Sequence, residues 1–474
     1  MQQPHISAYR GRRIHMVGIG GSSMSGLAEM LARDGFMVAG TNRDEGYTLS
    51  HLRGLGIEAR AGHHPDMVEG AALLVYSAAI PEEDPERQQA FALGIPQMER
   101  AVLLGELMAG HNQQVCIAGT HGKTTTSGML AQALFALGAD PTVHIGGSLD
   151  AIGGSVRAGG KGFFVAEACE FNRSFLHMPV TMALLLNIEE DHLDTYGDMA
   201  HVEEAYGQFL AQLPKDGVII VHGEDPRALR VARAAGREVL TFGLDSRSDY
   251  QISGLGYDAS GHAAFVLMHG GKALCHAALQ VRGIYNALHA AAALVAVHRL
   301  GLDVVKAAQA LGAFTGVHRR FEHTGMVQGM AMYHDYGHNP AEMQAAVGMA
   351  AMQGKRVIAV MKPHTFSRVK SLFDAYLTCT SEADITLVTD IYAAREKDPG
   401  DIHSRQLVKG MRANGLSAFL TPTFDDVEHW LLAHGKPGDL VITMGCGNIN
   451  LLNIQMQQQE DQKLLAQGRR NDGD

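Results

Sequence analysis

The sequence predicts an α/β protein of three domains, each built around a mostly parallel sheet. Three observations lead to this expectation. Short apolar runs typical of buried strands alternate with helical patterns, the alternation restarts twice along the chain, and two of the strand-to-helix turns are rich in glycine. The 474 residues also leave room for about three domains of ordinary size.

Composition narrows the class of protein. The 39 Lys and Arg residues against 50 Asp and Glu give a formal net charge of −11, which argues against nucleic acid or an anionic membrane as the main partner. Five dispersed cysteines, the absence of a signal-peptide pattern and the absence of a long apolar run favour a soluble cytoplasmic protein. The sequence is compatible with two oligomeric states, a monomer and a homodimer.

The first domain is expected over residues 1–107. The apolar run at 13–19 predicts a strand, a helical pattern follows it and ends at Gly35, and further strands are predicted at 36–40 and 72–80. Strand, helix and strand in this rhythm are typical of a doubly wound parallel sheet. The segment therefore predicts a Rossmann-like N-terminal domain.

Glycines fill the first strand-to-helix turn of this domain, at Gly18, Gly20 and Gly21. A helix that begins after such a turn offers backbone N–H groups to a diphosphate. The dinucleotide fingerprint requires glycine where this chain has Ser23, and Asp44 comes late for an acidic ribose partner. The turn thus favours a nucleotide diphosphate other than NAD, with a tight turn of packing glycines as the alternative.

The pattern restarts in a central domain expected over residues 108–319. Its strands are predicted at 114–119, 163–168, 182–188 and 218–223, and its helices at about 124–137 and 285–301. Between the first strand and the first helix the chain reads GTHGKTTT, residues 119–126. Its glycines let the backbone wrap a polyphosphate, Lys123 can neutralise phosphate oxygens, and the Thr124 hydroxyl stands where Mg²⁺ would bind. This loop predicts a P-loop-type ATPase domain.

Two acidic segments follow later strands of the central domain. EACEFNRSF (167–175) contains Glu167 and Glu170, and NIEEDHLDTY (187–196) contains His192 between two aspartates. A hard cation that bridges phosphate oxygens takes oxygen ligands and at most one imidazole. Each segment alone is compatible with a solvated turn, but together with the phosphate loop they predict a metal site.

A third alternating segment predicts a C-terminal Rossmann-like domain over residues 320–455. MAMYHDY, RVIAVMK, DITLVTD and DLVITMG are its strand-like runs. Residues 456–474 are polar and lack periodicity, which predicts a frayed or disordered tail.

Eight motifs occur in order between residues 18 and 400: GIGGSSMSG, GTHGKTTT, EACEFNRSFL, NIEEDHLDTYG, HRRFE, HDYGHNP, KPHTFSR and DIYAAREKDPG. This succession resembles the Mur ligase family over nearly the whole chain. The resemblance implies a UDP-substrate domain, a central ATPase domain and a C-terminal domain that contacts ATP and the amino acid.

The resemblance also implies roles for individual positions. The UDP substrate would be bound by Gly18, Gly20, Gly21, Ser22 and Ser77. ATP would be bound by Gly119, Thr120, His121, Gly122, Lys123, Thr124, Thr125, Asn286, Arg320 and Asp335. Mg²⁺ would be held by Thr124, Glu167 and His192. The incoming amino acid would be bound by Tyr336, His338, His364 and Arg368. The catalytic residues would be Lys123, Arg320, His338, His364 and Arg368.

Five positions depart from the pattern usual in the family. Ser23 stands for glycine, Asn42 for aspartate, Cys169 for the aspartate of EADE, Asn339 for the second of two histidines, and Thr365 for an arginine. Residues for every expected step of the reaction nevertheless remain, among them Lys123 and Glu167.

The implied activity is ATP-dependent formation of an amide between the carboxylate of UDP-N-acetylmuramate and L-alanine, through an acyl phosphate, in peptidoglycan synthesis. Two other activities stay open. One is the recycling ligation of a whole tripeptide to the same UDP-sugar, and the other is a nucleotide-sugar oxidoreductase that uses the first glycine turn. The oxidoreductase leaves Lys123 and the acidic segments unexplained.

Overall fold

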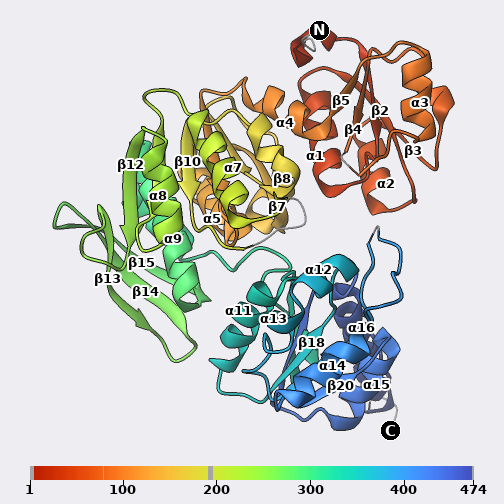
Figure 1. Cartoon of the computed structure of the whole chain (residues 1–474), viewed down its shortest axis with the longest axis vertical. Coiled ribbons are helices and arrows are strands. Elements are labelled where there is room, and N and C mark those ends of the chain that lie inside the picture. Colours follow the sequence, from red (N-terminus) through yellow and green to blue (C-terminus); the bar gives the residue numbers. More distant parts are fainter. Residues whose placement is uncertain (1–4, 78, 191–195, 395, 472–474) are drawn as a thin grey trace. The chain divides into compact units, whose positions relative to one another are not determined.

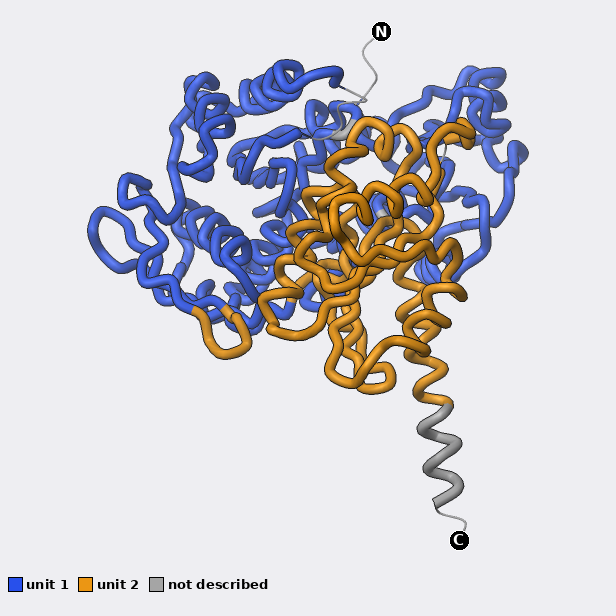
Figure 2. The backbone as a smooth tube through the Cα atoms, turned by 60° about the horizontal axis from the view of Figure 1, so that its bottom comes forward, with its two compact units in different colours: residues 1–256, 263–315 blue, residues 257–262, 316–474 orange. Residues whose placement is uncertain are grey.

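The computed structural model describes residues 5–77, 79–190, 196–394 and 396–471, without the side chains of residues 22, 171 and 463–471. The chain divides into two compact units, which Figure 2 colours separately. Unit 1 consists of residues 1–256 with 263–315, and unit 2 of residues 257–262 with 316–474.

Unit 1 begins with a five-stranded parallel sheet in the order β3-β2-β1-β4-β5. Its strands are β1 Arg13–Val17, β2 Met37–Asn42, β3 Glu58–Ala61, β4 Leu73–Tyr76 and β5 Gln97–Glu99. The accompanying helices are η1 Ile6–Tyr9, α1 Ser22–Arg33, α2 Tyr47–Gly54, η2 Pro65–Val68, α3 Pro85–Ala92 and α4 Arg100–Met108. The order places β1 at the centre, so the first glycine turn opens at the carboxyl edge beside β4.

A ten-stranded sheet follows in the order β15-β14-β13-β12-β11-β10-β6-β9-β7-β8. Strands β12 to β7 of this order run parallel, and β8 closes one edge antiparallel to β7. The strands are β6 Gln113–Ala118, β7 Thr142–Leu149, β8 Gly154–Arg157, β9 Phe163–Glu167, β10 Met182–Leu185, β11 Val218–His222, β12 Glu238–Gly243, β13 Tyr250–Tyr257, β14 His262–His269 and β15 Lys272–Arg282.

Helices pack against the apolar faces of this sheet (Figure 1). They are α5 Lys123–Ala136, η3 Asp150–Ile152, η4 Phe171–His177, α7 Met199–Ala211, α8 Pro226–Ala234, α9 Gly283–Arg299 and α10 Val304–Leu311. The alanines at 290–293 of α9 are fully buried, and α5 packs directly against this helix. Small side chains thus let α5 and α9 approach closely, which fixes the start of α5 beside the sheet.

Unit 2 contains a six-stranded sheet in the order β16-β17-β21-β18-β19-β20, with β16 antiparallel and the others parallel. The strands are β16 Glu322–Val327, β17 Met330–Asp335, β18 Val357–Met361, β19 Ile385–Val388, β20 Ala418–Leu420 and β21 Leu440–Met444. The helices are α11 Pro340–Ala351, α12 Phe366–Ser371, α13 Phe373–Tyr376, α14 Ser404–Ala413, α15 Phe424–His434 and α16 Asn450–Asn471. β21 lies between β17 and β18, so the carboxyl ends of these three strands meet at one edge.

The predicted α/β class with parallel sheets is confirmed, but the predicted disordered tail is wrong. Residues 456–471 continue helix α16. Ile449, Leu452 and Met456 are buried in one apolar cluster with residues of the sheet, and the Asn453 amide donates to Tyr333 O at 3.0 Å. The few apolar residues recur at helical spacing, and the polar residues between them conceal this pattern in the sequence. Among the helices of the described residues, none has the length and hydropathy that a membrane crossing requires.

Two helical glycines give a test of the packing in unit 1. A Cβ on Gly105 of α4 would lie 1.9 Å from the carbonyl oxygen of His177, whereas a Cβ on Gly207 of α7 would meet nothing within 4 Å. We expect Gly105→Ala to lower the free energy of unfolding by about 1–3 kcal/mol through overpacking. Gly207→Ala, the matched control, should raise it by about 0.5–1 kcal/mol through helix propensity. Urea unfolding measures both, and equal shifts would contradict this packing.

Candidate functional site

The phosphate loop lies between β6 and α5, at the carboxyl edge of the ten-stranded sheet. Gly119 has a φ of 140° and Gly122 a φ of 81°, values that favour glycine. A Cβ on Gly122 would also lie 2.1 Å from Nε2 of His289, so space as well as backbone conformation requires glycine there. The N-cap residue of α5 is Gly122, which has no side chain to cap the first turn. The N–H groups of this turn are therefore oriented to bind an anion.

Lys123 is held inside this loop. Its Nζ donates to Gly119 O at 2.6 Å, to Thr120 O at 3.0 Å and to Oε1 of Glu170 at 3.0 Å. Burial by itself lowers the pKa of Lys123, but the Glu170 carboxylate, helped by Cys169 and Glu167, outweighs burial and raises the pKa. The side chain is therefore an ammonium ion at neutral pH, available to neutralise phosphate oxygens.

Thr124 and Glu167, two of the three expected Mg²⁺ ligands, lie together. The Thr124 hydroxyl donates to Oε2 of Glu167 at 2.8 Å, and the same oxygen accepts from Gly146 N at 2.8 Å. A hydroxyl and a carboxylate are oxygen donors of the kind that Mg²⁺ prefers. The third expected ligand, His192, lies outside the described residues. Within the described part of the chain, no group of three or more His, Cys, Asp or Glu residues could hold a metal ion.

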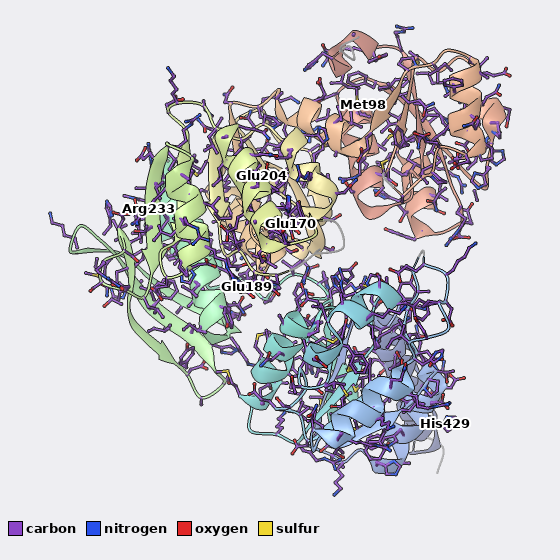
Figure 3. All side chains as sticks on the ribbon, viewed as in Figure 1. Met98, Glu170, Glu189, Glu204, Arg233 and His429 are labelled. Carbon is purple, nitrogen blue, oxygen red and sulfur yellow. The ribbon has the colours of Figure 1, made fainter. Side chains whose placement is uncertain are left out.

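Asn187, which the sequence did not single out, fastens the phosphate loop to the end of β10. Its Oδ1 accepts from His121 N at 2.8 Å, and its Nδ2 donates to His121 O at 3.2 Å. Glu189 N donates to the Thr120 hydroxyl at 2.9 Å. Figure 3 labels Glu170 and Glu189, which follow β9 and β10 at the same edge of the sheet. The NIEEDH motif could thus be recognised in the sequence, but its asparagine, Asn187, forms hydrogen bonds with the phosphate loop and is not placed as a metal ligand.

A cavity of about 290 Å³ lies beside the phosphate loop and has room for a planar base. It is lined by Leu186, Asn187, Ile188, Glu189, His222, Glu224, Asp225, Pro226, Arg227, Phe242, Tyr285, Leu288 and His289. Burial, with smaller effects of His222 and His121, lowers the pKa of His289 to about 4, so the His289 imidazole is uncharged at neutral pH. Asn286, one of the predicted ATP-binding residues, is not among the lining residues. Its amide donates instead to Arg282 O at 2.7 Å.

The first glycine turn lies at the carboxyl edge of β1. Gly18 has a φ of 77°, and a Cβ on Gly20 would lie 2.7 Å from the Asn42 side chain. Gly21 precedes α1, which begins at Ser22, whose side chain is not described. Ser77 follows β4, and because β1 and β4 are parallel neighbours, the topology brings the predicted UDP contacts to one edge.

Ser23 has a different role from the glycine that it replaces. Its Oγ lies 2.7 Å from Nε2 of His144 on β7 and accepts from the Arg100 guanidinium at 3.1 Å. Burial and then the charge of Arg100 lower the pKa of His144 to about 4. The imidazole is therefore neutral. This contact ties the start of α1 to the ten-stranded sheet.

In unit 2, Arg320, Asp335 and Tyr336 lie at the end of β17. Asp335 accepts from Phe321 N at 2.8 Å and from Gly337 N at 2.6 Å, and its burial raises its pKa although Arg320 acts in the opposite direction. The Arg320 guanidinium lies 5.4 Å from the centre of the Tyr336 ring. Arg319 and Phe321, on either side of Arg320, have positive φ values of 66° and 45°. Such strain is typical of functional loops.

His338, His364 and Arg368 form the rest of the predicted amino-acid site. The two imidazole rings meet edge to face with centroids 5.5 Å apart, and Nη1 of Arg368 lies 3.1 Å from Nδ1 of His364. Burial, with His338 and Arg368 adding to it, lowers the pKa of His364 to about 4. His364 is therefore a neutral hydrogen-bonding group beside a guanidinium.

Three family models match successive parts of the chain: "Mur ligase family, catalytic domain" over residues 13–112, "Mur ligase middle domain" over 117–297, and "Mur ligase, glutamate ligase domain" over 319–447. The chain belongs to the Mur ligase family.

Among curated relatives, proteins named UDP-N-acetylmuramate–L-alanine ligase are similar over nearly the full length. The protein of Acetivibrio thermocellus is 39% identical, covering 92% of this chain and 94% of its own. That of Caldanaerobacter subterraneus subsp. tengcongensis is also 39% identical, covering 94% and 97%.

Solved structures share the fold. The UDP-N-acetylmuramate-alanine ligase MurC of Thermotoga maritima has a TM-score of 0.79 and 24% identity, covering 95% of this chain and all of its own. A murein peptide ligase of Psychrobacter arcticus has a TM-score of 0.73 and 23% identity, covering 94% and 98%.

The close approach of Gly122 to His289 gives a test of the phosphate loop. We expect Gly122→Ala to weaken binding of ATP at least tenfold, because the added methyl group displaces either the loop or His289. Gly138→Ala is the matched control, since Gly138 also has a positive φ of 71° but its Cβ would meet nothing within 4 Å. The control should cost about 1–2 kcal/mol of stability and leave ATP affinity unchanged. Calorimetric titration with ATP measures both, and a similar loss of affinity in the two variants would contradict the steric argument.

Proposed function

We propose that this chain is an ATP-dependent, Mg²⁺-requiring ligase that joins L-alanine to the lactyl carboxylate of UDP-N-acetylmuramate in peptidoglycan synthesis, in the cytoplasm. The observation that carries the proposal is the phosphate loop, in which a charged Lys123 lies beside the Thr124–Glu167 pair. The 39% identity to relatives that bear the name UDP-N-acetylmuramate–L-alanine ligase supports the choice of substrates.

ATP would bind with its phosphates on the N–H groups of α5 and on Lys123. Thr124 and Glu167 would hold Mg²⁺, with His192 as the third expected ligand, and the bound ion would add positive charge at the phosphate oxygens. The base would enter the cavity lined by Phe242 and Tyr285. Positioning and neutralisation of charge are the main demands that phosphoryl transfer makes on a protein.

A carboxylate is a poor electrophile, so it must be activated before an amine can attack it. A lactyl carboxylate oxygen would attack the γ-phosphorus of ATP, which gives an acyl phosphate and ADP. The amine of L-alanine would then attack the acyl carbon, and inorganic phosphate would leave from the tetrahedral intermediate. Arg320 would offset the charge of the transferred phosphoryl group. Because His364 is neutral, it can accept a hydrogen bond from the amino group of L-alanine, and it does not repel that group when the group is protonated.

The UDP moiety would bind at the turn of Gly18, Gly20 and Gly21, together with Ser22 and Ser77. An oxidoreductase built on this turn would use it for NAD. Ser23, which stands at a glycine position of the NAD fingerprint, hydrogen-bonds His144 and Arg100. An oxidoreductase would also leave the phosphate-loop residue Lys123 without a function. The recycling ligation of a tripeptide is the competing proposal, and a protein of Psychrobacter arcticus that is named murein peptide ligase shares the fold.

An assay of ADP release tests the proposal. The enzyme is incubated with ATP, Mg²⁺ and UDP-N-acetylmuramate, and with L-alanine, with the tripeptide or with neither. We expect rapid release of ADP only with L-alanine. Release that requires the tripeptide would establish the recycling activity instead, and release that is independent of any amine would contradict a ligase.

Lys123→Ala tests the division of labour within unit 1. We expect ADP formation to fall by at least 10²–10³-fold, because a preorganised positive charge on the phosphates is lost. UDP-N-acetylmuramate should still bind within about threefold of the wild type in calorimetry, since its turn lies on another sheet.

Two further variants complete this experiment. Lys123→Ala leaves the Glu170 carboxylate buried without its partner, so Lys123→Ala/Glu170→Gln separates lost catalysis from lost stability. Lys306→Ala, at an exposed lysine of α10, should behave as the wild type. Loss of UDP-sugar binding in the double variant would refute the division of labour.

A further inference from the structure

Lys362 is a buried cation that none of the predicted roles includes. It follows β18, and its side chain lies at the edge where β17, β21 and β18 end. The residue is only 8% exposed. Its Nζ donates to Oδ1 of Asn448 and lies 4.5 Å from the centre of the Tyr392 ring and 5.0 Å from that of Phe424.

No carboxylate pairs with this ammonium ion among the described residues. Burial lowers the pKa of Lys362, and the thiol of Cys446 acts in the opposite direction. Lysine is rarely buried without an anionic partner, because the lost hydration of the ammonium is costly. One amide oxygen and two aromatic faces offset part of this cost. An anion that binds from outside would offset the rest.

The surroundings of Lys362 are positively charged on the side of the predicted amino-acid site. The Tyr392 ring, which Lys362 faces, stacks on His364 with centroids 5.7 Å apart. Nη1 of Arg368 lies 3.1 Å from Nδ1 of His364. Burial raises the pKa of the Cys446 thiol to about 11, although the nearby charges of Arg368, Lys362 and Arg319 act in the opposite direction. The cations thus surround the loop that follows β21.

Glu396, an acidic side chain that acts on His364, already accepts hydrogen bonds from other residues. Its Oε1 accepts from the Thr365 hydroxyl at 2.6 Å, and its Oε2 accepts from Ser367 N at 2.9 Å. It therefore orders the start of α12 and does not pair with Lys362. Lys362 faces the Tyr392 ring and Arg368 contacts His364, so two cations lie near the predicted amino-acid site, an arrangement that suits a small carboxylate better than a neutral group.

We propose that Lys362, together with Arg368, binds the carboxylate of the incoming amino acid and so selects α-amino acids over other amines. This inference rests on the proposed function, because it assigns a residue to the amino-acid site of that reaction. The neutral His364, which Arg368 contacts, can accept a hydrogen bond from the amino group of the same amino acid. Lys362 is then a specificity-determining residue, which the sequence conceals because KPH reads as the end of a strand.

Removal of the charge from both the enzyme and the substrate tests the inference. Lys362→Met and Lys362→Gln remove the charge, Lys362→Arg keeps it, and L-alaninamide replaces the carboxylate of L-alanine with an uncharged amide. We expect Lys362→Met to raise the KM for L-alanine about 10- to 100-fold, the range of a lost hydrogen bond to a charged group. The KM values for ATP and UDP-N-acetylmuramate should stay within about threefold. Lys362→Arg should recover part of the loss.

The preference for L-alanine over L-alaninamide gives the decisive readout. It should be large in the wild type and in Lys370→Met, the matched control, whose ammonium is exposed and paired with Asp401. It should collapse in Lys362→Met or, if that variant does not fold, in Lys362→Gln. A preference for L-alanine that is preserved in these variants would overturn the inference. An increase that is confined to the KM for ATP would also overturn it, because it would show that Lys362 binds a phosphate of ATP. Wild-type turnover with L-alanine tests the proposed function separately.

Discussion

The ion pair between Lys123 and Glu170 is the interaction on which the nucleotide half of the site depends. It keeps an ammonium ion charged inside a buried loop, where burial alone would favour the neutral amine. The pair spans two neighbouring parallel strands, since Lys123 follows β6 and Glu170 follows β9. A change in the register of these two strands would therefore move the Glu170 carboxylate away from Lys123 in the phosphate loop.

The same edge of the sheet gathers the other groups of the loop. Glu167 ends β9 and reaches Thr124, while Asn187 follows β10 and holds His121. These residues are far apart in sequence and come together only because parallel strands end on one side. In unit 2, the parallel strands β17, β21 and β18 likewise end on one side of their sheet, which brings Asp335, Cys446 and Lys362 together. Both units thus build a charged site from one architectural rule.

Much of this site could be predicted from the sequence, because its signals are local. GTHGKTTT carries its own glycines, lysine and threonine, and the alternation of strands and helices predicted the class of fold. The contacts of Asn187, of Ser23 with His144, and of Lys362 with Asn448 join distant segments, and no local pattern encodes the order of strands that creates them. Helix α16 was missed because its buried face consists of few residues within a polar stretch.

In the proposed reaction, the phosphate loop around Lys123 directs the transfer of a phosphoryl group from ATP to the carboxylate of the sugar substrate. Isotope transfer tests it directly. UDP-N-acetylmuramate labelled with ¹⁸O in both carboxylate oxygens is converted with ATP and L-alanine, and the released phosphate is analysed by mass spectrometry or ³¹P NMR. An acyl phosphate intermediate predicts one ¹⁸O atom in each phosphate and one in each new amide. Unlabelled phosphate from a reaction that still forms the amide would contradict the account.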